Sequence, residues 1–468
     1  MQGTWATSVG LDLHLELSGA RPRAALESAL REAVRGGRLV PGTALPSSRV
    51  LAADLRLARN TVADAYAQLI AEGWLAARHG SGTWVAERAA QPRPAVAAER
   101  PTERQSRYDL RPGTPDVSAF PRSAWLAAGR RALGAAPAGD LAGYPSPQGL
   151  PELRAALAEY LARARGVAVT PERVIVTAGF AEGLDLVCQI LRARGVRALA
   201  VESYGLPEHR EIAAVRGLQL DPVPVDSPGA VLSAEVLSSA GAILLTPAHQ
   251  FPLGMALAPQ RRRQAADWAV RTGGLLIEDD YDGEFRYDRQ AVGALQALAP
   301  EHIIYGGTAS KSLAPGLRLG WLVVPAGLVA EITEAKRATV RLSSSLDQLA
   351  LAEFIASGQY DRQVRRMRTV YRQRRDRLLR ALAQEVPDVR LTGIVAGLQA
   401  LALLPDRLGE DEVVARARKH GLMLKGLADF RAGEQSHPPG LVLGYATPPA
   451  HAFTTAIARL CAVLRSAA

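Results

Sequence analysis

Gly307–Gly320 reads GTASKSLAPGLRLG and contains Lys311, one of only four lysines in a chain with 52 arginines. An arginine cannot lose its proton to become a nucleophile, so a retained lysine indicates a position that needs an amine. Apolar runs at Ile303–Tyr305 and Trp321–Val324 predict a strand on each side of a small polar loop. An amine there, beside hydroxyls and followed by Arg318, suits a Schiff base with a phosphate-bearing aldehyde cofactor. The alternative is a surface lysine on a connecting loop.

Length and composition predict a globular protein of two or three domains, since the chain has 468 residues, 48% hydrophobic and 22% charged. Cys188 and Cys461 fall in apolar helical patterns, so we expect buried thiols with neither a disulfide framework nor a metal site. We expect no membrane span and no secretory signal, which favours a cytoplasmic location. The formal net charge of +10 permits a polyanionic partner.

Three regions follow one another along the chain. Residues 11–88 form a compact first unit, 89–107 are a proline- and alanine-rich tether, and 108–468 form the larger unit, with a small helix-rich lobe from about 345. The strand candidates of the larger unit are Val174–Val176, Leu199–Val201, Ala242–Leu245, Leu275–Ile277, Ile303–Tyr305 and Leu322–Val324. Because helical patterns separate them, we predict an α/β fold with a mainly parallel sheet.

Arginine is concentrated in Asp361–Arg380, which contains nine arginines and two aspartates. The favoured interpretation is the solvated face of a long helix. A patch that faces DNA is the alternative, and the sequence leaves both open.

The first unit has the pattern of a DNA-binding helix pair. Leu26, Ala29, Leu30 and Ala33 repeat at helical spacing, and Ser47 is a suitable N-cap for the next helix. A tight turn leads to a further helix that begins near Arg59, and two short helices in this order match a recognition helix in the major groove.

Side chains suited to DNA gather at the helix starts. Arginine fits a guanine edge and asparagine an adenine edge, while hydroxyls and backbone amides at a helix start suit phosphates. A glycine-tipped hairpin after the helices could lie along the DNA backbone. The residues expected to contact DNA are Ser47, Ser48, Arg49, Arg59, Asn60, Thr61, Gly80 and Gly82.

These motifs together resemble the winged helix of the GntR superfamily. Leu45-Pro46-Ser47-Ser48-Arg49, then Arg59-Asn60-Thr61-Val62, then Gly80-Ser81-Gly82-Thr83-Trp84-Val85 follow that pattern in order, with Ala58 where the family often has serine. The alternative, a helical bundle that does not bind DNA, would rarely carry all three. Residues 1–88 have ten basic and eight acidic side chains, so binding should depend on placed contacts and dimerisation.

The larger unit resembles fold-type-I aminotransferases, and the whole chain resembles MocR/GabR-type regulators, which join a GntR winged helix to such a domain. The resemblance implies a pyridoxal 5'-phosphate (PLP) site on Lys311. In Glu278-Asp279-Asp280-Tyr281 it implies that Asp279 holds the ring nitrogen and Tyr281 the ring hydroxyl. The other residues that it implies for the cofactor are Ser310 and Arg318 at the phosphate, Gly179, Phe180 and Ala181 at a helix start, His249, and Tyr144 from the partner subunit.

Substrate positions depart from the aminotransferase pattern. The family's Glu-Asp-Pro-Gly-Tyr is Glu202-Ser203-Tyr204-Gly205-Leu206 here, and Leu253 stands where a small hydroxyl residue is usual. Where a carboxylate-binding arginine is expected, the chain has Asp429-Phe430-Arg431, so Arg431 is either that arginine displaced or Asp429 has replaced it. Tyr204 and Arg431 are the residues expected at an effector.

The resemblance therefore implies a PLP-binding transcriptional regulator that senses an amino acid, an amine or PLP itself and binds a double-stranded operator as a head-to-tail homodimer. Aldimine exchange at Lys311 would distinguish the ligand states, with full transamination weak or absent. One alternative is a working aminotransferase with a secondary DNA-binding domain. The other is a structural DNA-binding protein, which would not explain why Lys311, Asp279 and Tyr281 are all present.

Overall fold

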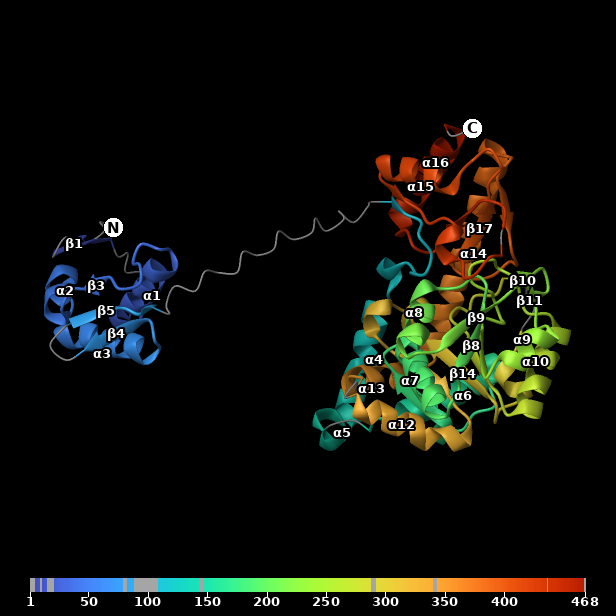
Figure 1. Ribbon diagram of the computed structural model, residues 1–468, viewed down its shortest axis with the longest axis horizontal. Helices are drawn as coiled ribbons and strands as arrows, with labels where there is room; N and C mark the ends of the chain where they lie inside the picture. Colours follow the sequence, from blue (N-terminus) through green and yellow to red (C-terminus); the bar gives the residue numbers. More distant parts are fainter. Residues whose placement is uncertain are drawn as a thin grey trace. The chain divides into compact units, whose positions relative to one another are not determined.

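The computed structural model describes residues 5–8, 11–14, 21–78, 82–87, 108–143, 146–287, 292–339, 343–435 and 437–466. The chain divides into two compact units, Met1–Arg104 and Gln105–Ala468 (Figure 1). The predicted tether falls outside the described ranges, so the boundaries 11–88, 89–107 and 108–468 stay predictions.

The smaller unit combines three helices with a three-stranded antiparallel sheet in the order β3-β5-β4. Its elements are β1 (Trp5–Ser8), β2 (Leu11–His14), α1 (Pro22–Arg35), β3 (Ala44–Leu45), α2 (Ser48–Leu55), α3 (Arg59–Ala71), β4 (Leu75–Arg78) and β5 (Gly82–Val85). The helical spacing predicted for α1 is confirmed, because Leu26 and Leu30 are buried against Leu51, Val62 and Leu69 of α2 and α3.

The angle between α2 and α3 is set by short-range chemistry. Ser47 caps α2 as predicted, since its Oγ accepts a hydrogen bond from Val50 N at 3.3 Å. Arg56 ends α2 in the left-handed region with φ 53°, which turns the chain sharply into α3. The buried Tyr66 hydroxyl of α3 donates to Pro46 O at 3.0 Å and fixes α3 against the start of α2.

A seven-stranded sheet organises the larger unit. Its order is β7 (Val174–Thr177), β15 (Gly320–Val323), β14 (Ile303–Thr308), β13 (Leu275–Asp279), β12 (Ala242–Leu245), β8 (Ala198–Glu202) and β9 (Gln219–Val223). Only β15 among these strands runs antiparallel to its neighbours, so the predicted mainly parallel sheet is confirmed. The sequence missed β9, whose proline and polar residues hide the strand pattern.

Helices cover both faces of this sheet, which explains why its strands are almost wholly apolar. α7 (Phe180–Ala193), α8 (Pro207–Val215) and α12 (Val329–Ala338) cover one face. α6 (Pro151–Arg165), α10 (Pro259–Thr272) and α13 (Ser345–Ala356) cover the other, and α4 (Arg122–Ala135) packs on α13. The shorter elements are α5 (Ala138–Ala142), β10 (Val225–Asp226), β11 (Gly229–Ala230), α9 (Ala234–Ser239) and α11 (Ala309–Ser312).

A smaller lobe follows α13 (red and orange in Figure 1). It contains α14 (Gln359–Glu385), β16 (Arg390–Thr392), β17 (Ala400–Leu403), α15 (Glu410–Lys419), β18 (Leu422–Met423), β19 (Gly440–Leu443) and α16 (Ala450–Arg465). β6 (Tyr108–Asp109) pairs in parallel with β18, so the lobe also holds the beginning of the larger unit. Because α13 packs beside the main sheet, the lobe's own elements begin with α14 rather than at about 345.

Among the described helices none combines the length and the apolar character that crossing a bilayer requires. Within the same residues, no group of three or more His, Cys, Asp or Glu side chains is placed to bind a metal ion. Cys188 and Cys461 are both free and buried.

Candidate functional site

A pocket lies at the carboxyl ends of the central strands, where open α/β sheets bind ligands. Asp279 ends β13, Thr308 ends β14, and Lys311 follows in α11. The predicted residues that line this pocket are Gly179, Phe180, Ala181, Tyr204, Asp279, Tyr281, Ser310, Lys311 and Arg318. Tyr144 lies outside the described residues.

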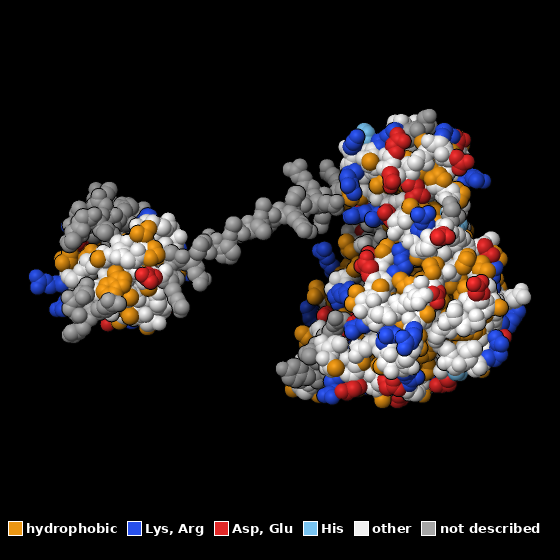
Figure 2. Space-filling model, in the orientation of Figure 1, with side chains coloured by type: hydrophobic (Ala, Val, Ile, Leu, Met, Phe, Trp, Pro, Cys, Tyr) orange, Lys and Arg blue, Asp and Glu red, His pale blue; other side chains and the backbone are white. Residues whose placement is uncertain are grey.

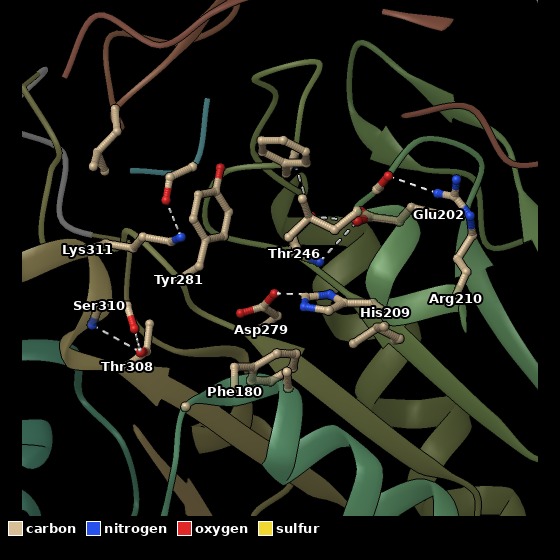
Figure 3. Close-up of a pocket in the computed structure, with 18 of the residues that line it drawn as sticks. Phe180, Glu202, His209, Arg210, Thr246, Asp279, Tyr281, Thr308, Ser310 and Lys311 are labelled. Atoms are coloured by element: carbon tan, nitrogen blue, oxygen red, sulfur yellow. Dashed lines mark hydrogen bonds and ion pairs between the residues drawn. The ribbon is translucent and has the colours of Figure 1, made fainter. Parts of the chain in front are cut away.

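The amine of Lys311 enters the pocket from one side. Figure 3 shows Lys311, Tyr281 and Asp279 directed toward the same space. Burial lowers the pKa of Lys311, and the carboxylates of Asp279 and Asp282 oppose that shift. The Nζ donates a hydrogen bond to the backbone carbonyl of Gly113. A lysine with a lowered pKa supplies more of the neutral amine that can act as a nucleophile.

Asp279 is a buried acid whose two carboxylate oxygens have different surroundings. Its side chain is only 3% exposed, and its Oδ1 has no hydrogen-bond partner among the described residues. Its Oδ2 lies 3.8 Å from His209 Nδ1, and burial lowers the pKa of that histidine to about 4. Burial also raises the pKa of Asp279 well above its usual range, although Lys311 opposes this. A cationic donor in the pocket would satisfy this carboxylate.

Tyr281 is held by a chain of polar contacts behind the pocket. Its hydroxyl accepts a hydrogen bond from Gln399 Nε2 at 2.8 Å and lies 3.1 Å from His249 Nδ1. His249 Nδ1 also lies 2.8 Å from Asp282 Oδ2. His249 is 3% exposed and is not part of the pocket lining, so it positions Tyr281 and does not face the space itself.

An anion-binding cradle occupies another side of the pocket. Gly179 is the N-cap of α7 with φ 104°, a conformation that other residues rarely adopt, and among the described residues no side chain is found capping the amides of the first turn. A Cβ at Gly179 would lie 3.5 Å from Arg318 Nη1, so this guanidinium is beside the helix start. Thr308 Oγ1 donates to Ser310 Oγ at 2.9 Å nearby. A helix start, a guanidinium and hydroxyls together have the chemistry that suits a phosphate group.

The sequence reasoning missed several residues of the lining, among them Glu202, His209, Arg210, Thr246, Phe251 and Gln399. Glu202 ends β8 and accepts hydrogen bonds from Thr246 N at 3.2 Å and from Thr246 Oγ1. Burial raises the pKa of Glu202 to about 7. Because Glu202 ends one strand and Thr246 follows the next, the rule that ligands bind at carboxyl ends of strands could have found both.

The two residues predicted at an effector are placed differently. Tyr204 lines the pocket, and its hydroxyl donates to Gln435 O at 3.0 Å. Arg431 pairs with Tyr204 through the backbone, but its side chain is exposed and is not part of the lining. Asp429 is also exposed and lies 3.4 Å from Lys425 Nζ. On this side the lining contains Arg210 instead, which donates to the carbonyls of Gly205, Phe430 and Arg431 (Figure 3).

The residues predicted to contact DNA gather at the starts of α2 and α3. Arg49, Arg59 and Asn60 are exposed, and no polar partner is recorded for their side chains among the described residues. Thr61 is partly exposed on the first turn of α3. Gly82 begins β5 with φ 92°. Gly80 lies outside the described residues.

Comparison with known proteins agrees with this arrangement. Residues 22–85 match the family described as bacterial regulatory proteins, gntR family, and residues 113–420 match aminotransferase class I and II. The chain is 35% identical over 423 residues to the HTH-type pyridoxine biosynthesis transcriptional regulator PdxR of Corynebacterium glutamicum, with 90% of this chain and 91% of that protein covered. The chain belongs to the MocR-type transcriptional regulators.

This MocR-type regulator is also 35% identical over 441 residues to the probable rhizopine catabolism regulatory protein MocR of Rhizobium meliloti, with 89% and 88% of the two chains covered. Its larger unit resembles LysN, an α-aminoadipate aminotransferase of Thermus thermophilus solved with N-(5'-phosphopyridoxyl)-L-leucine, at a TM-score of 0.69 and 26% identity. The match covers 78% of the regulator and 93% of LysN. The predicted winged helix joined to a fold-type-I domain is thus confirmed.

Proposed function

We propose that this regulator binds PLP at Lys311 and that the occupied pocket reports a small amine, an amino acid or PLP itself to the winged helix. The observation that carries the proposal is the buried Asp279 carboxylate, whose free oxygen faces the same space as the Lys311 amine. A buried acid without a partner is costly, and a protonated ring nitrogen would satisfy it.

The residues of the pocket fit PLP part by part. The start of α7 at Gly179 with Arg318 and Ser310 would hold the phosphate, and Tyr281 would donate to the ring hydroxyl. Bound PLP supplies a carbonyl carbon that reacts with primary amines and a ring that accepts electrons. The lowered pKa gives Lys311 a larger share of the neutral amine. Asp279 would keep a proton on the ring nitrogen.

The DNA-binding part of the proposal rests on the exposed residues of the smaller unit. Arg59 and Asn60 would read base edges in a double-stranded operator. The remaining predicted residues, namely Ser47, Ser48, Arg49, Thr61, Gly80 and Gly82, would fix the register on the backbone. A regulator that reads chromosomal DNA in a bacterium acts in the cytoplasm, which we propose as its location.

We propose a sensor with weak or absent turnover rather than a working aminotransferase. The exposed Arg431 and Asp429 leave the pocket without the expected carboxylate clamp at that position. An effector held loosely can exchange at Lys311 without being oriented for repeated proton transfer.

A head-to-tail homodimer completes the proposal, with Tyr144 reaching the partner's site. Its support is a set of exposed apolar side chains on α4 and on α13, which packs on α4: Leu126 is 66%, Leu133 50% and Leu346 50% exposed. Exposed apolar side chains that cluster in this way are typical of subunit interfaces.

Borohydride reduction tests the site. With PLP added, the wild type should retain the cofactor on the peptide that contains Lys311 after reduction, as mass spectrometry of digests would show. Lys311→Ala should lose this label, while Lys419→Ala, which changes an exposed lysine, should keep it. Asp279→Asn should weaken PLP binding about tenfold or more, since a hydrogen bond to a charged group contributes about 1.5–3 kcal/mol.

Two results would count against the proposal. A Lys311→Ala protein that is still labelled by borohydride would remove the lysine assignment. Efficient turnover of any amino donor in a broad panel would favour the aminotransferase over the sensor.

A further inference from the structure

The arginines of α14 form a surface outside the lining of the pocket. Most of them are exposed, namely Arg362, Arg365, Arg366, Arg368, Arg372, Arg377 and Arg380. Arg374 is buried and structural, because it pairs with Asp116 at 2.7 Å and donates to the carbonyls of Ala446 and Pro448. We call the exposed set the α14 arginine face.

The net positive charge of the larger unit is concentrated in this helix. Residues 108–468 contain 42 basic and 36 acidic side chains, a net charge of +6. α14 alone contains nine arginines against Asp361, Asp376 and Glu385, which is also +6. The rest of the unit is therefore neutral, and on the face shown in Figure 2 its basic and acidic side chains are interspersed.

Much of this charge is not neutralised within the unit. Arg362, Arg365 and Arg377 have no recorded ion-pair or hydrogen-bond partner among the described residues. Asp361, which precedes Arg362 in the chain, is held by Arg163 at 2.7 Å. Arg372 has only a long contact, 4.0 Å, with Asp376.

A groove runs beside α14, and arginines of this helix line it. Arg286, Arg368 and Arg372 line it together with Tyr287, Thr369, Gln373 and Asp376. Arg368 is fixed there by two hydrogen bonds to the carbonyl of Glu284, at 2.9 and 2.6 Å. Guanidinium, hydroxyl and amide donors in one groove suit phosphate oxygens.

We propose that the α14 arginine face binds the phosphate backbone of the duplex that the winged helices read. This inference rests on the DNA-binding part of the proposed function. Arg362 and Arg380 are 18 residues apart, about 27 Å along a helix, which spans roughly eight base pairs at about 3.4 Å each. Only Leu379, 42% exposed, offers a large apolar contact on this helix, so neither a membrane nor an apolar protein surface fits as well.

The smaller unit gives a reason for a second contact. Residues 1–88 have a net charge of only +2, so one winged helix neutralises few phosphates. The tether predicted over 89–107 would hold bound DNA at a high effective concentration near the larger unit. Weak backbone contacts become useful at such concentrations even though each would be negligible alone.

The test compares two triple variants of the full chain. The first is Arg362→Gln, Arg365→Gln and Arg377→Gln, and the matched control is Arg197→Gln, Arg263→Gln and Arg418→Gln, which removes the same charge from exposed arginines elsewhere. The probe is an 80-base-pair duplex that carries an operator selected with the wild type from random-sequence DNA. Binding is measured over a range of salt concentrations, and thermal melting checks that each variant is folded.

We expect the first variant to bind the duplex more weakly and to lower the log–log salt slope by up to about 2.7, since each lost phosphate contact removes about 0.9. The control should match the wild type. Equal salt slopes for the two variants would overturn the proposal. The proposal would also fail if the α14 variant lost binding to polyglutamate or to anionic vesicles while its DNA binding stayed unchanged. Failure of the winged-helix assignment is separate, because it would appear as unchanged binding in an Arg59→Ala, Asn60→Ala protein.

Discussion

Glu202 is a buried acid at the edge of the pocket whose proton is linked to stability. Burial raises its pKa from 4.5 to about 7, so between these values the folded protein binds a proton that the unfolded chain releases. Its contribution to stability is therefore complete below about pH 4.5 and is lost as the pH rises through about 7. The loss amounts to at most about 3.4 kcal/mol, since the two pKa values differ by about 2.5 and each pKa unit corresponds to roughly 1.36 kcal/mol.

Glu202→Gln removes this ionisation and keeps an oxygen for Thr246. We expect the variant to melt at a higher temperature than the wild type at pH 8 and at a similar temperature at pH 5. Glu235→Gln, an exposed change on α9, should show no such pH-dependent difference. If the melting temperature of Glu202→Gln differed from that of the wild type by the same amount at pH 5 and at pH 8, ionisation of Glu202 would cost the folded protein little stability.

At the scale of elements, α3 presents the side chains that should determine sequence preference. Arg59→Ala and Asn60→Ala each remove a bidentate base contact, which contributes roughly 1–3 kcal/mol of discrimination, so specificity should relax at one operator position in each case. Competition between the selected operator and single-base variants measures this. Arg21→Ala removes an exposed arginine before α1 and should leave the preferences unchanged. If the two α3 variants kept every preference, the recognition-helix assignment would be wrong.

Sequence reasoning succeeded for elements with strong local signals. The central strands are apolar runs between helical patterns. Asp279 ends β13, and Lys311 follows shortly after the end of β14. β9 escaped because Pro222 and polar neighbours give an edge strand no apolar pattern. Such a strand is set by its partner β8 and not by its own residues.

The pocket was predictable in part for the same reason. Residues next to a strand end could be assigned, whereas Arg210 lies inside α8 and is held at the lining by the carbonyls of Gly205, Phe430 and Arg431. The Arg431 side chain is exposed because residues 428–430 form a tight turn that directs the following residue outward. No spacing in the sequence encodes either outcome, since both depend on tertiary packing.

For the whole molecule, the apolar surface on α4 makes the oligomeric state testable. Leu126→Glu with Leu133→Glu would place two charges in the proposed interface, so we expect sedimentation to show monomers and PLP binding to weaken. Val215→Glu changes an isolated exposed side chain on α8, 85% exposed, and should leave the dimer intact. A dimer that tolerates both glutamates would place the interface elsewhere.

The hydrogen bond from Lys311 to the carbonyl of Gly113 joins the pocket to the beginning of the larger unit. Gly113 follows β6 by only a few residues, and β6 pairs with β18 of the smaller lobe. A nitrogen bonded to the carbonyl carbon of a cofactor would keep fewer protons to donate to Gly113, and an ordinary hydrogen bond of this kind contributes about 0.5–1.5 kcal/mol. The bonding state of one nitrogen therefore bears on how the backbone around Gly113 is held at the start of the larger unit.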